Sequence, residues 1–357
     1  ELVSLHLLDP DIRIDAETET VSFGAGVRYG DLGSELQAQG WALRNLASLP
    51  HISVAGAVAT GTHGSGDRNG TLSRAVTGLD LVTADGEILA ITPGDPDFNG
   101  AVVALGALGV VTRITLDIQP TFDLRQDVYD GLTWARFLEN FDAIMGRAYS
   151  VSVFTTWDDA AVGTVWLKSA IGSARPPADL YGARPVSVGA HPIDEVDADS
   201  RTEQGGVPGA WIDRLPHFRI GFTPSNGEEL QSEYLVPRHH AIEAIEVVRA
   251  LADRIAPLLH ISELRTVAAD SLWLSGAYEQ DVVAIHFTWK FEPDAVRALL
   301  PDLESALRPF SARPHWGKVF DSVDRGLYPK LNDFVALADR LDPRAKFRNE
   351  WLDRNLF

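Results

Sequence analysis

The chain has 357 residues, of which 45% are hydrophobic, and a formal net charge of -19. This length is sufficient for a large core and two domains, and the negative charge repels nucleic acid phosphates and anionic membrane surfaces. We therefore expect neither nucleic acid nor a membrane as a partner. The absence of cysteine excludes a disulfide scaffold and a thiol nucleophile. No segment has the length of a transmembrane helix and no signal peptide opens the chain, so we expect a cytoplasmic protein.

The first 120 residues alternate short strands with a helix, which is typical of an α+β domain. Gly40 is expected to cap the helix at its C-terminal end, and Asp85-Gly86 is a strong hairpin turn signal. The segment from Gly24 to Gly30 departs from the glycine pattern of proteins that bind nicotinamide dinucleotides. Its last glycine comes one position late, and no acidic residue follows at the spacing required to bind the ribose. It is interpreted as a tight turn from strand to helix. The elements predicted here are strands at 5–8, 19–23, 79–83, 87–91 and 110–118 and a helix at 31–39.

The pattern changes at about residue 121. A helix is predicted around 133–146, followed by alternating strands and a second helix near 239–256. Residues 171–209 are rich in Pro, Gly, Ala and Asp and too long for an ordinary connection. They are either a surface excursion or a flap over the crevice, and we interpret them as a surface excursion.

Residues 45–66 form the most informative stretch, Asn-Leu-Ala-Ser-Leu-Pro-His-Ile-Ser-Val-Ala-Gly-Ala-Val-Ala-Thr-Gly-Thr-His-Gly-Ser-Gly. Small residues and glycines allow backbone amides to approach a ligand closely, and the run contains no Lys or Arg. It suits a flat cofactor with a phosphate tail that is held by main-chain N–H groups and hydroxyls. A Gly/Ala-rich turn between strands is the alternative. A nucleoside triphosphate loop is excluded, since no Gly-Lys-Ser or Gly-Lys-Thr follows.

Two period-two segments carry polar residues on one side. Glu263 and Arg265 share a face of the first segment, and His286 and Thr288 share a face of the second. If the two strands are neighbours, these side chains form a catalytic patch on a rigid sheet. Lys318, in an aromatic setting, could join it, whereas solvated side chains are the alternative for each residue.

Other chemistries fit the spacing poorly. His239 and His240 are adjacent, so on a helix they point apart and cannot chelate one ion; we predict no metal site. No Gly-x-Ser-x-Gly elbow is present, so a serine hydrolase is not expected.

The glycine-rich run and the polar segments resemble the alditol (xylitol or sorbitol) oxidases of the vanillyl-alcohol-oxidase, PCMH-type family of FAD-linked oxidoreductases. The segments Gln231-Ser232-Glu233-Tyr234, Arg265 to Asp270 and Leu341 to Phe347 carry the same resemblance. It implies an α+β protein with a PCMH-type FAD-binding domain and a substrate (cap) domain whose mixed or antiparallel sheet is flanked by helices. The predicted domains are 1–120 (FAD-binding), 121–330 (substrate) and 331–357 (a C-terminal segment returning to the FAD domain).

The resemblance also implies FAD as cofactor, with a covalent histidyl link from a loop upstream of these residues. The linking residue is absent from this sequence, which begins at Glu1 and has Met145 as its one methionine. We therefore expect the FAD-binding domain to be N-terminally incomplete.

By the same resemblance, a set of small and polar residues is expected to surround cofactor and substrate. The catalytic candidates are Lys318, Arg265 and His286, with the general base left open between His286 and Lys318. Substrate-binding candidates are Ser48, Glu263, Arg265, His286, Thr288 and Lys318. Cofactor-binding candidates are Ala47, Ser48, His51, Ser53, Gly56, Ala57, Thr60, Gly61, His63, Gly64, Gly109 and Val110.

The implied reaction is oxidation of the terminal primary alcohol of an alditol such as xylitol or sorbitol to the aldose, with O2 reduced to H2O2. The expected partners are the polyol and O2, and the expected state is a monomer. Two alternatives remain open: an aldonolactone oxidase or dehydrogenase of the same family, and a non-catalytic polyol-binding fragment.

Overall fold

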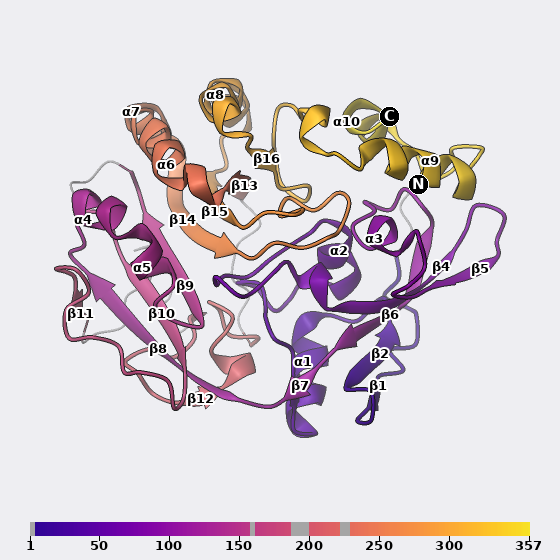
Figure 1. Ribbon diagram of the computed structural model, residues 1–357, viewed down its shortest axis with the longest axis horizontal. Coiled ribbons are helices and arrows are strands. Elements are labelled where there is room, and N and C mark those ends of the chain that lie inside the picture. Colours follow the sequence, from indigo (N-terminus) through magenta and orange to yellow (C-terminus); the bar gives the residue numbers. More distant parts are fainter. Residues whose placement is uncertain (1–3, 158–160, 187–199, 222–228) are drawn as a thin grey trace.

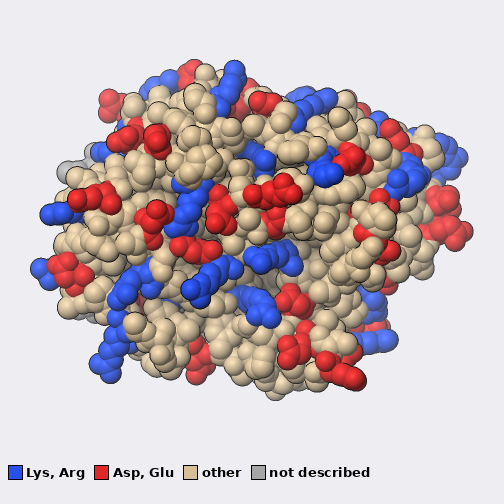
Figure 2. Space-filling view, viewed as in Figure 1, with Lys and Arg blue, Asp and Glu red and all other residues tan. Residues whose placement is uncertain are grey.

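The computed structural model describes residues 4–157, 161–186, 200–221 and 229–357. Two antiparallel sheets lie next to each other, the smaller built mainly from the N-terminal third and the larger from the middle of the chain (Figure 1). Within these ranges, every helix is too short or too polar to cross a membrane. Acidic and basic side chains are interspersed on the face shown in Figure 2.

The smaller sheet has five strands in the order β1-β2-β6-β4-β5. Short helices connect or cover these strands, and a two-stranded ribbon leads out of the sheet. Its strands are β1 (Arg13–Asp15), β2 (Thr20–Gly24), β4 (Val76–Val82), β5 (Ile88–Ile91) and β6 (Val110–Asp117); the ribbon is β3 (Trp41–Ala42) with β7 (Gln119–Pro120); the helices are α1 (Tyr29–Ala38), α2 (Val54–Ala59) and α3 (Phe98–Ala101).

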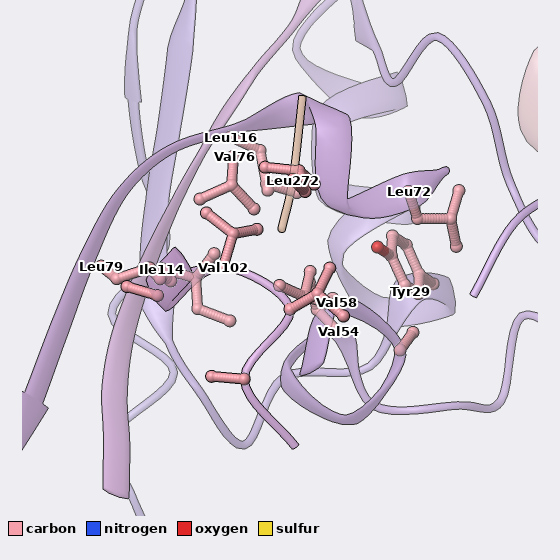
Figure 3. Packing of buried hydrophobic residues seen from close by; sticks show 14 of the residues in the cluster. Tyr29, Val54, Val58, Leu72, Val76, Leu79, Val102, Ile114, Leu116 and Leu272 are labelled. Carbon is pink, nitrogen blue, oxygen red and sulfur yellow. The ribbon is translucent and has the colours of Figure 1, made fainter. Parts of the chain in front are cut away.

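One core joins this sheet to the end of the chain. Val54 and Val58 of α2 are buried in it together with Val102 and Ile114 (Figure 3). The C-terminal helices α9 (Leu331–Leu341) and α10 (Glu350–Asn355) bury their apolar residues in the same core and lie beside the N-terminal half of the chain (Figure 1). The division into domains at residues 120 and 330 stays a prediction.

The larger sheet has nine strands, in the order β11-β8-β10-β9-β14-β15-β13-β16 with β12 paired to β8. Its strands are β8 (Asp123–Asp130), β9 (Ser150–Thr155), β10 (Val165–Ala170), β11 (Arg184–Pro185), β12 (Gly209–Ala210), β13 (Glu229–Pro237), β14 (Leu259–Val267), β15 (Val282–Lys290) and β16 (Arg313–Pro314). Its helices are α4 (Trp134–Glu139), α5 (Phe141–Met145), α6 (Ala241–Arg249), α7 (Ala252–Ile255) and α8 (Pro293–Leu307).

These helices cover one face of the larger sheet. Leu264, Ile285 and Phe287 lie in the same buried cluster as the apolar side chains of α6 and α8. Because side chains alternate along a strand, their neighbours Glu263 and His286 are on the other face. That face is directed toward the small-residue segment, residues 47–63, across a shared cavity.

Several predicted elements are confirmed and three are wrong. The strand at 19–23, the helix at 31–39, the 79–91 hairpin and the strand at 110–118 match β2, α1, β4 with β5, and β6. Residues 5–8 form a turn instead of a strand, because the Leu8 N–H donates to Leu5 O (3.0 Å) and no neighbouring strand is available among the described residues. The helices predicted at 133–146 and 239–256 are each interrupted, the first at Asn140 and the second after Arg249.

The predicted surface excursion at 171–209 is only partly described, since residues 187–199 lie outside the described ranges. Its described ends pair with β8 through β11 and β12.

Candidate active site

A cavity of about 1020 Å³ lies between the small-residue segment and the polar face of the larger sheet. One wall comes from residues 47–63, including the N-terminal end of α2. The opposite wall comes from β13, β14 and β15, and residues 315–319 close one side. The cavity therefore lies between the two parts of the fold that the sequence singled out.

The side chains in the wall formed by residues 47–63 are mostly small, and none is a lysine, arginine or carboxylate. Ser53 is the N-cap of α2, and its hydroxyl accepts a hydrogen bond from the Gly56 N–H (3.3 Å). Gly64 packs tightly behind this wall, since a Cβ at this position would collide with Leu46 O and Asn45 Oδ1. Side chains this small leave room for a flat ring against the backbone.

Gly64→Ala is expected to displace the 45–47 segment, because the added methyl group meets a backbone carbonyl. Such overpacking costs about 1–3 kcal/mol of the free energy of unfolding, and we expect a matching fall in the urea midpoint with weaker retention of FAD. Gly221→Ala is the control, since a Cβ there meets no atom of the described residues within 4 Å. Equal midpoints for both variants would contradict the close approach.

Register places polar side chains in one row across three strands. Glu263 of β14 is paired with His286 of β15, and His286 is paired with Glu233 of β13. Paired residues on adjacent antiparallel strands point to the same face. Arg265 and Thr288, each two positions along from this row, share that face. All five are at least 90% buried, so the row faces the cavity instead of open solvent.

Glu233 is the centre of charge in this row. Its Oε2 lies 2.5 Å from Lys318 Nζ and its Oε1 lies 2.6 Å from Arg265 Nη2. Burial alone would raise the pKa of the Glu233 carboxyl, but the positive charges of Lys318 and Arg265 hold this pKa well below its usual range. The site therefore contains a permanent carboxylate that anchors two cations.

Lys318 also determines the state of His286. Its Nζ donates to His286 Nδ1 (2.7 Å), so the imidazole proton is on Nε2, which donates to Thr288 Oγ1 (3.1 Å). Burial, assisted by the charge of Lys318, lowers the pKa of His286 to about 4. Burial also lowers the pKa of Lys318, against the opposing effect of Glu233. His286 is consequently neutral near pH 7, and the Thr288 hydroxyl proton is free to reach a ligand.

Glu263 is held from behind by a second cluster. Its Oε1 accepts from His217 Nε2 (2.8 Å), and His217 Nδ1 is 2.9 Å from Lys168 Nζ. Burial would raise the pKa of Glu263, but Arg265 and His217 lower it below its usual range. Burial lowers the pKa of Lys168 to about 7 and that of His217 to about 4.

Acid is expected to destabilise the fold through the two buried neutral histidines. His217 and His286 have a folded pKa of about 4, against about 6.5 in the unfolded chain. The unfolded state therefore binds more protons between these values, and stability that is complete above pH 6.5 is lost as the pH falls toward 4. At 1.36 kcal/mol per pKa unit, the loss is about 3 kcal/mol for each histidine across this window.

The measurement for the acid effect is the urea midpoint at a series of pH values from 7 to 5. His286→Gln should flatten the decline, whereas a substitution at the exposed His239 should leave it unchanged. A midpoint independent of pH over this range would contradict the assignment of neutral buried imidazoles.

The structure brings together most of the residues that the sequence selected. All six substrate-binding candidates line the cavity, as do Ala47, Ser53, Gly56, Ala57, Thr60 and His63 among the cofactor-binding candidates. The other candidates are outside the cavity lining: His51 Nε2 donates to Ile220 O (2.8 Å), Gly61 and Gly64 lie behind the wall, Gly109 directly precedes β6, and Val110 begins it. The roles of all these residues stay predictions.

Four charged or polar residues were not selected from the sequence: Glu233, His217, Lys168 and His315. Glu233 alternates with Gln231 on β13, and this period-two pattern was the available signal. Lys168 is the one charge in the apolar strand β10, which could have indicated a buried partner. Nothing local marks His217, because only the tertiary fold brings it to Glu263.

His63, Glu233 and His315 have donor atoms within 4.8 Å of one another. Glu233 already pairs with two cations at 2.5 and 2.6 Å, which would repel a metal ion at this position. The absence of a metal site stays a prediction.

The cavity wall fits a flavin. His63 Nδ1 donates to Gly64 O (2.9 Å). Its Nε2 is buried at the cavity, 3.3 Å from Glu233 Oε1, and makes no hydrogen bond among the described residues. A polar group of a bound ligand would give this nitrogen a partner. Ala47, Ser48, Gly56 and Ala57 provide the flat, uncharged surface beside it.

Comparison with known proteins identifies the class. The FAD binding domain family matches residues 2–92, and the D-arabinono-1,4-lactone oxidase family matches residues 225–355. The fold is similar to that of cholesterol oxidase from Brevibacterium sterolicum, with a TM-score of 0.77 at 14% identity over 99% of this chain and 84% of the other. Together with the cavity, these matches define an FAD-binding oxidoreductase.

Two relatives are similar over nearly the whole chain. The alditol oxidase of a Streptomyces species is 49% identical over 98% of this chain and 84% of its own. The L-gulono-1,4-lactone dehydrogenase of Mycobacterium tuberculosis is 30% identical over 99% of this chain and 86% of its own. The chain belongs to the same family as alditol oxidase, the vanillyl-alcohol-oxidase (PCMH-type) FAD-linked oxidoreductases.

Proposed function

We propose that this protein is an FAD-dependent alditol oxidase, which converts the terminal primary alcohol of a sugar alcohol such as xylitol or sorbitol to the aldose and reduces O2 to H2O2. The observation that carries this proposal is the row of Glu263, His286 and Glu233, completed by Arg265 and Lys318, opposite a wall that fits a flavin. The 49% identity to an alditol oxidase supports the same substrate class.

A polyol fits the character of the cavity. Hydroxyl groups both donate and accept hydrogen bonds, and the polar wall offers carboxylate acceptors together with guanidinium, ammonium and hydroxyl donors. Glu263 and Thr288 are placed to bind hydroxyls along a chain, since both line the cavity. A site built in this way rejects analogues that lack a hydroxyl group.

FAD, when bound, supplies the acceptor for the hydride that leaves the carbinol carbon. Residues 47–63 would hold it, and Ala47, Ser48, Gly56 and Ala57 of this segment line the cavity. The remaining chemistry is removal of the hydroxyl proton. We assign this proton to the pair formed by Lys318 and His286, whose Nζ and Nδ1 atoms are 2.7 Å apart.

Lys318 and Arg265 stabilise the negative charge that develops on the alcohol oxygen. Lys318 contacts the oxygen and passes a proton toward His286 Nδ1, while Glu233 keeps the lysine in place. His286 is a poor final acceptor, because burial and the neighbouring cations lower its pKa and so disfavour its charged form. The pair therefore holds the proton only transiently and releases it to water, and the H2O2 formed from O2 takes up a proton in its place.

The test is the visible spectrum of the purified protein before and after anaerobic addition of xylitol. Bleaching of the flavin absorbance by xylitol, followed by H2O2 formation when air is admitted, is the expected result. Loss of absorbance without peroxide would indicate a dehydrogenase. A spectrum unchanged by xylitol and by sorbitol would contradict the proposal.

Oxidation of an aldonolactone is the second candidate. It is favoured by the match of residues 225–355 to the D-arabinono-1,4-lactone oxidase family and by the 30% identity to a lactone dehydrogenase. Parallel reduction experiments with L-gulono-1,4-lactone discriminate between the two, since the better substrate has the larger rate of bleaching per unit concentration.

A further inference from the structure

A buried chain of hydrogen bonds runs from Lys168, outside the cavity lining, through His217 to Glu263, both of which line the cavity. We propose that Lys168 and His217 are positioning residues that fix Glu263 as the hydrogen-bond acceptor for substrate hydroxyls remote from the reacting carbon. This inference rests on the proposed function. Lys168 itself is not among the residues that line the cavity, so its effect must pass through His217 and Glu263.

Lys168 has a complete set of partners. It belongs to β10, is 1% exposed, and places Nζ 2.6 Å from Leu215 O, 3.0 Å from Pro216 O and 2.9 Å from His217 Nδ1. Carbonyl oxygens only accept, so the lysine donates to both. The third N–H of an ammonium group is then directed to the imidazole, and all three donors are used.

This third bond selects one form of His217. Because Nδ1 accepts from Lys168, the imidazole proton is on Nε2, which donates to Glu263 Oε1 at 2.8 Å. The other tautomer would place a lone pair of Nε2 against the carboxylate. A partner on the far nitrogen of an imidazole commonly determines the tautomer and orientation of the ring in this way.

The backbone of the same residue connects the two walls of the cavity. The N–H groups of His217 and Phe218 both donate to Ser48 O, at 3.0 and 3.3 Å. His217 thus fixes Ser48 on the small-residue wall through its main chain and Glu263 on the polar wall through its side chain. Lys168 holds this segment from beneath by its bonds to the preceding carbonyls.

The arrangement leaves acceptor capacity on Glu263 for substrate. One oxygen accepts from His217 Nε2 (2.8 Å), and the other is 3.6 Å from Arg265 Nε. A carboxylate accepts up to about four hydrogen bonds, so lone pairs remain for a ligand in the cavity. Loss of the His217 donor should let the side chain rotate and weaken binding of remote hydroxyls, which raises KM more than it lowers kcat.

The experiment is a double-mutant cycle on steady-state oxidation of xylitol by the FAD-loaded protein. Lys168→Met is expected to raise KM by about 10-fold to 100-fold with a change in kcat of less than about threefold. In the Glu263→Leu background the same substitution should change KM by less than about twofold, since the group through which it acts is gone. Equal effects in both backgrounds would overturn the proposal.

Lys290→Met is the matched control. Lys290, on β15, also donates to a backbone carbonyl, Pro257 O at 2.8 Å, but lies outside the cavity. Its substitution should leave KM unchanged in both backgrounds. A rise in KM equal to that of Lys168→Met would show that removal of any such lysine is sufficient, and would overturn the assignment.

A second pair of variants decides the question if Lys168→Met does not fold. His217→Gln retains volume and an amide N–H that can reach Glu263, whereas His217→Leu removes the donor. We expect a small rise in KM for glutamine and a rise of about 10-fold or more for leucine. Equal values for the two variants would overturn the proposal.

The outcomes separate this inference from the proposed function. A wild-type protein that is reduced by no polyol contradicts the proposed function. If xylitol reduces the flavin of the wild-type protein but the effects of Lys168→Met and Glu263→Leu on KM are independent of each other, only the role of Lys168 and His217 is contradicted. The urea midpoints of the four proteins in the cycle measure the coupling between Lys168 and Glu263 without substrate. If the effects of the two substitutions on the urea midpoint are also additive, the buried chain does not couple Lys168 to Glu263.

Discussion

Lys318→Met should lower kcat for xylitol by about 10²–10⁴-fold, the usual contribution of a positioned acid or base. Lys318 Nζ lies between Glu233 Oε2 and His286 Nδ1, at 2.5 and 2.7 Å, and its side chain lines the cavity. Methionine keeps the length of the side chain but removes the charge and the proton. The affinity for FAD should change far less, because the ammonium group of Lys318 bonds to Glu233 and His286 of the polar wall and to no residue of the 47–63 wall.

Stopped-flow reduction of the flavin by xylitol without oxygen measures this step directly. Lys318→Arg should recover only part of the rate, since arginine keeps the positive charge but cannot release its proton near neutral pH. Lys330→Met is the control, because Lys330 is partly exposed and pairs with Asp333. A rate of flavin reduction in Lys318→Met within about threefold of the wild type would remove this residue from the mechanism.

The second large effect is expected for Glu233→Gln. This substitution keeps the shape of the side chain but leaves Lys318 buried without its counter-charge and Arg265 with Glu263 alone, at 3.6 Å. Removal of one partner of a buried pair costs about 3–5 kcal/mol in the free energy of unfolding. We expect the urea midpoint at pH 7 to fall accordingly and kcat to fall with it, because Lys318 loses its anchor.

Glu139→Gln gives the comparison for an exposed ion pair. Glu139 is 3.0 Å from Arg136, and both side chains are more than 60% exposed, so its loss should cost no more than about 1 kcal/mol. If the two glutamine variants had the same urea midpoint, the buried carboxylate would not be the electrostatic centre of the site.

Local sequence patterns determined the individual elements and much of the chemistry. Period-two alternation placed Glu263 with Arg265 and His286 with Thr288 on common faces, and the Asp85-Gly86 pair located a hairpin. Both are properties of residues close together in the chain. The resemblance of residues 45–66 to flavin-binding proteins likewise indicated FAD, because the small residues that admit a flat cofactor are contiguous in the sequence.

Only the tertiary structure decided which of these faces meet and what state their groups adopt. The register between β13, β14 and β15 brings Glu233 beside His286, although the two are more than 50 positions apart in the chain. The 215–218 segment brings His217 to Glu263. The pKa values of these groups are set by burial and by the pairing of charges. Both depend on packing between residues that are far apart in the chain. The sequence by itself determined which groups the site could use, and the fold decided which of them are neighbours and which are charged.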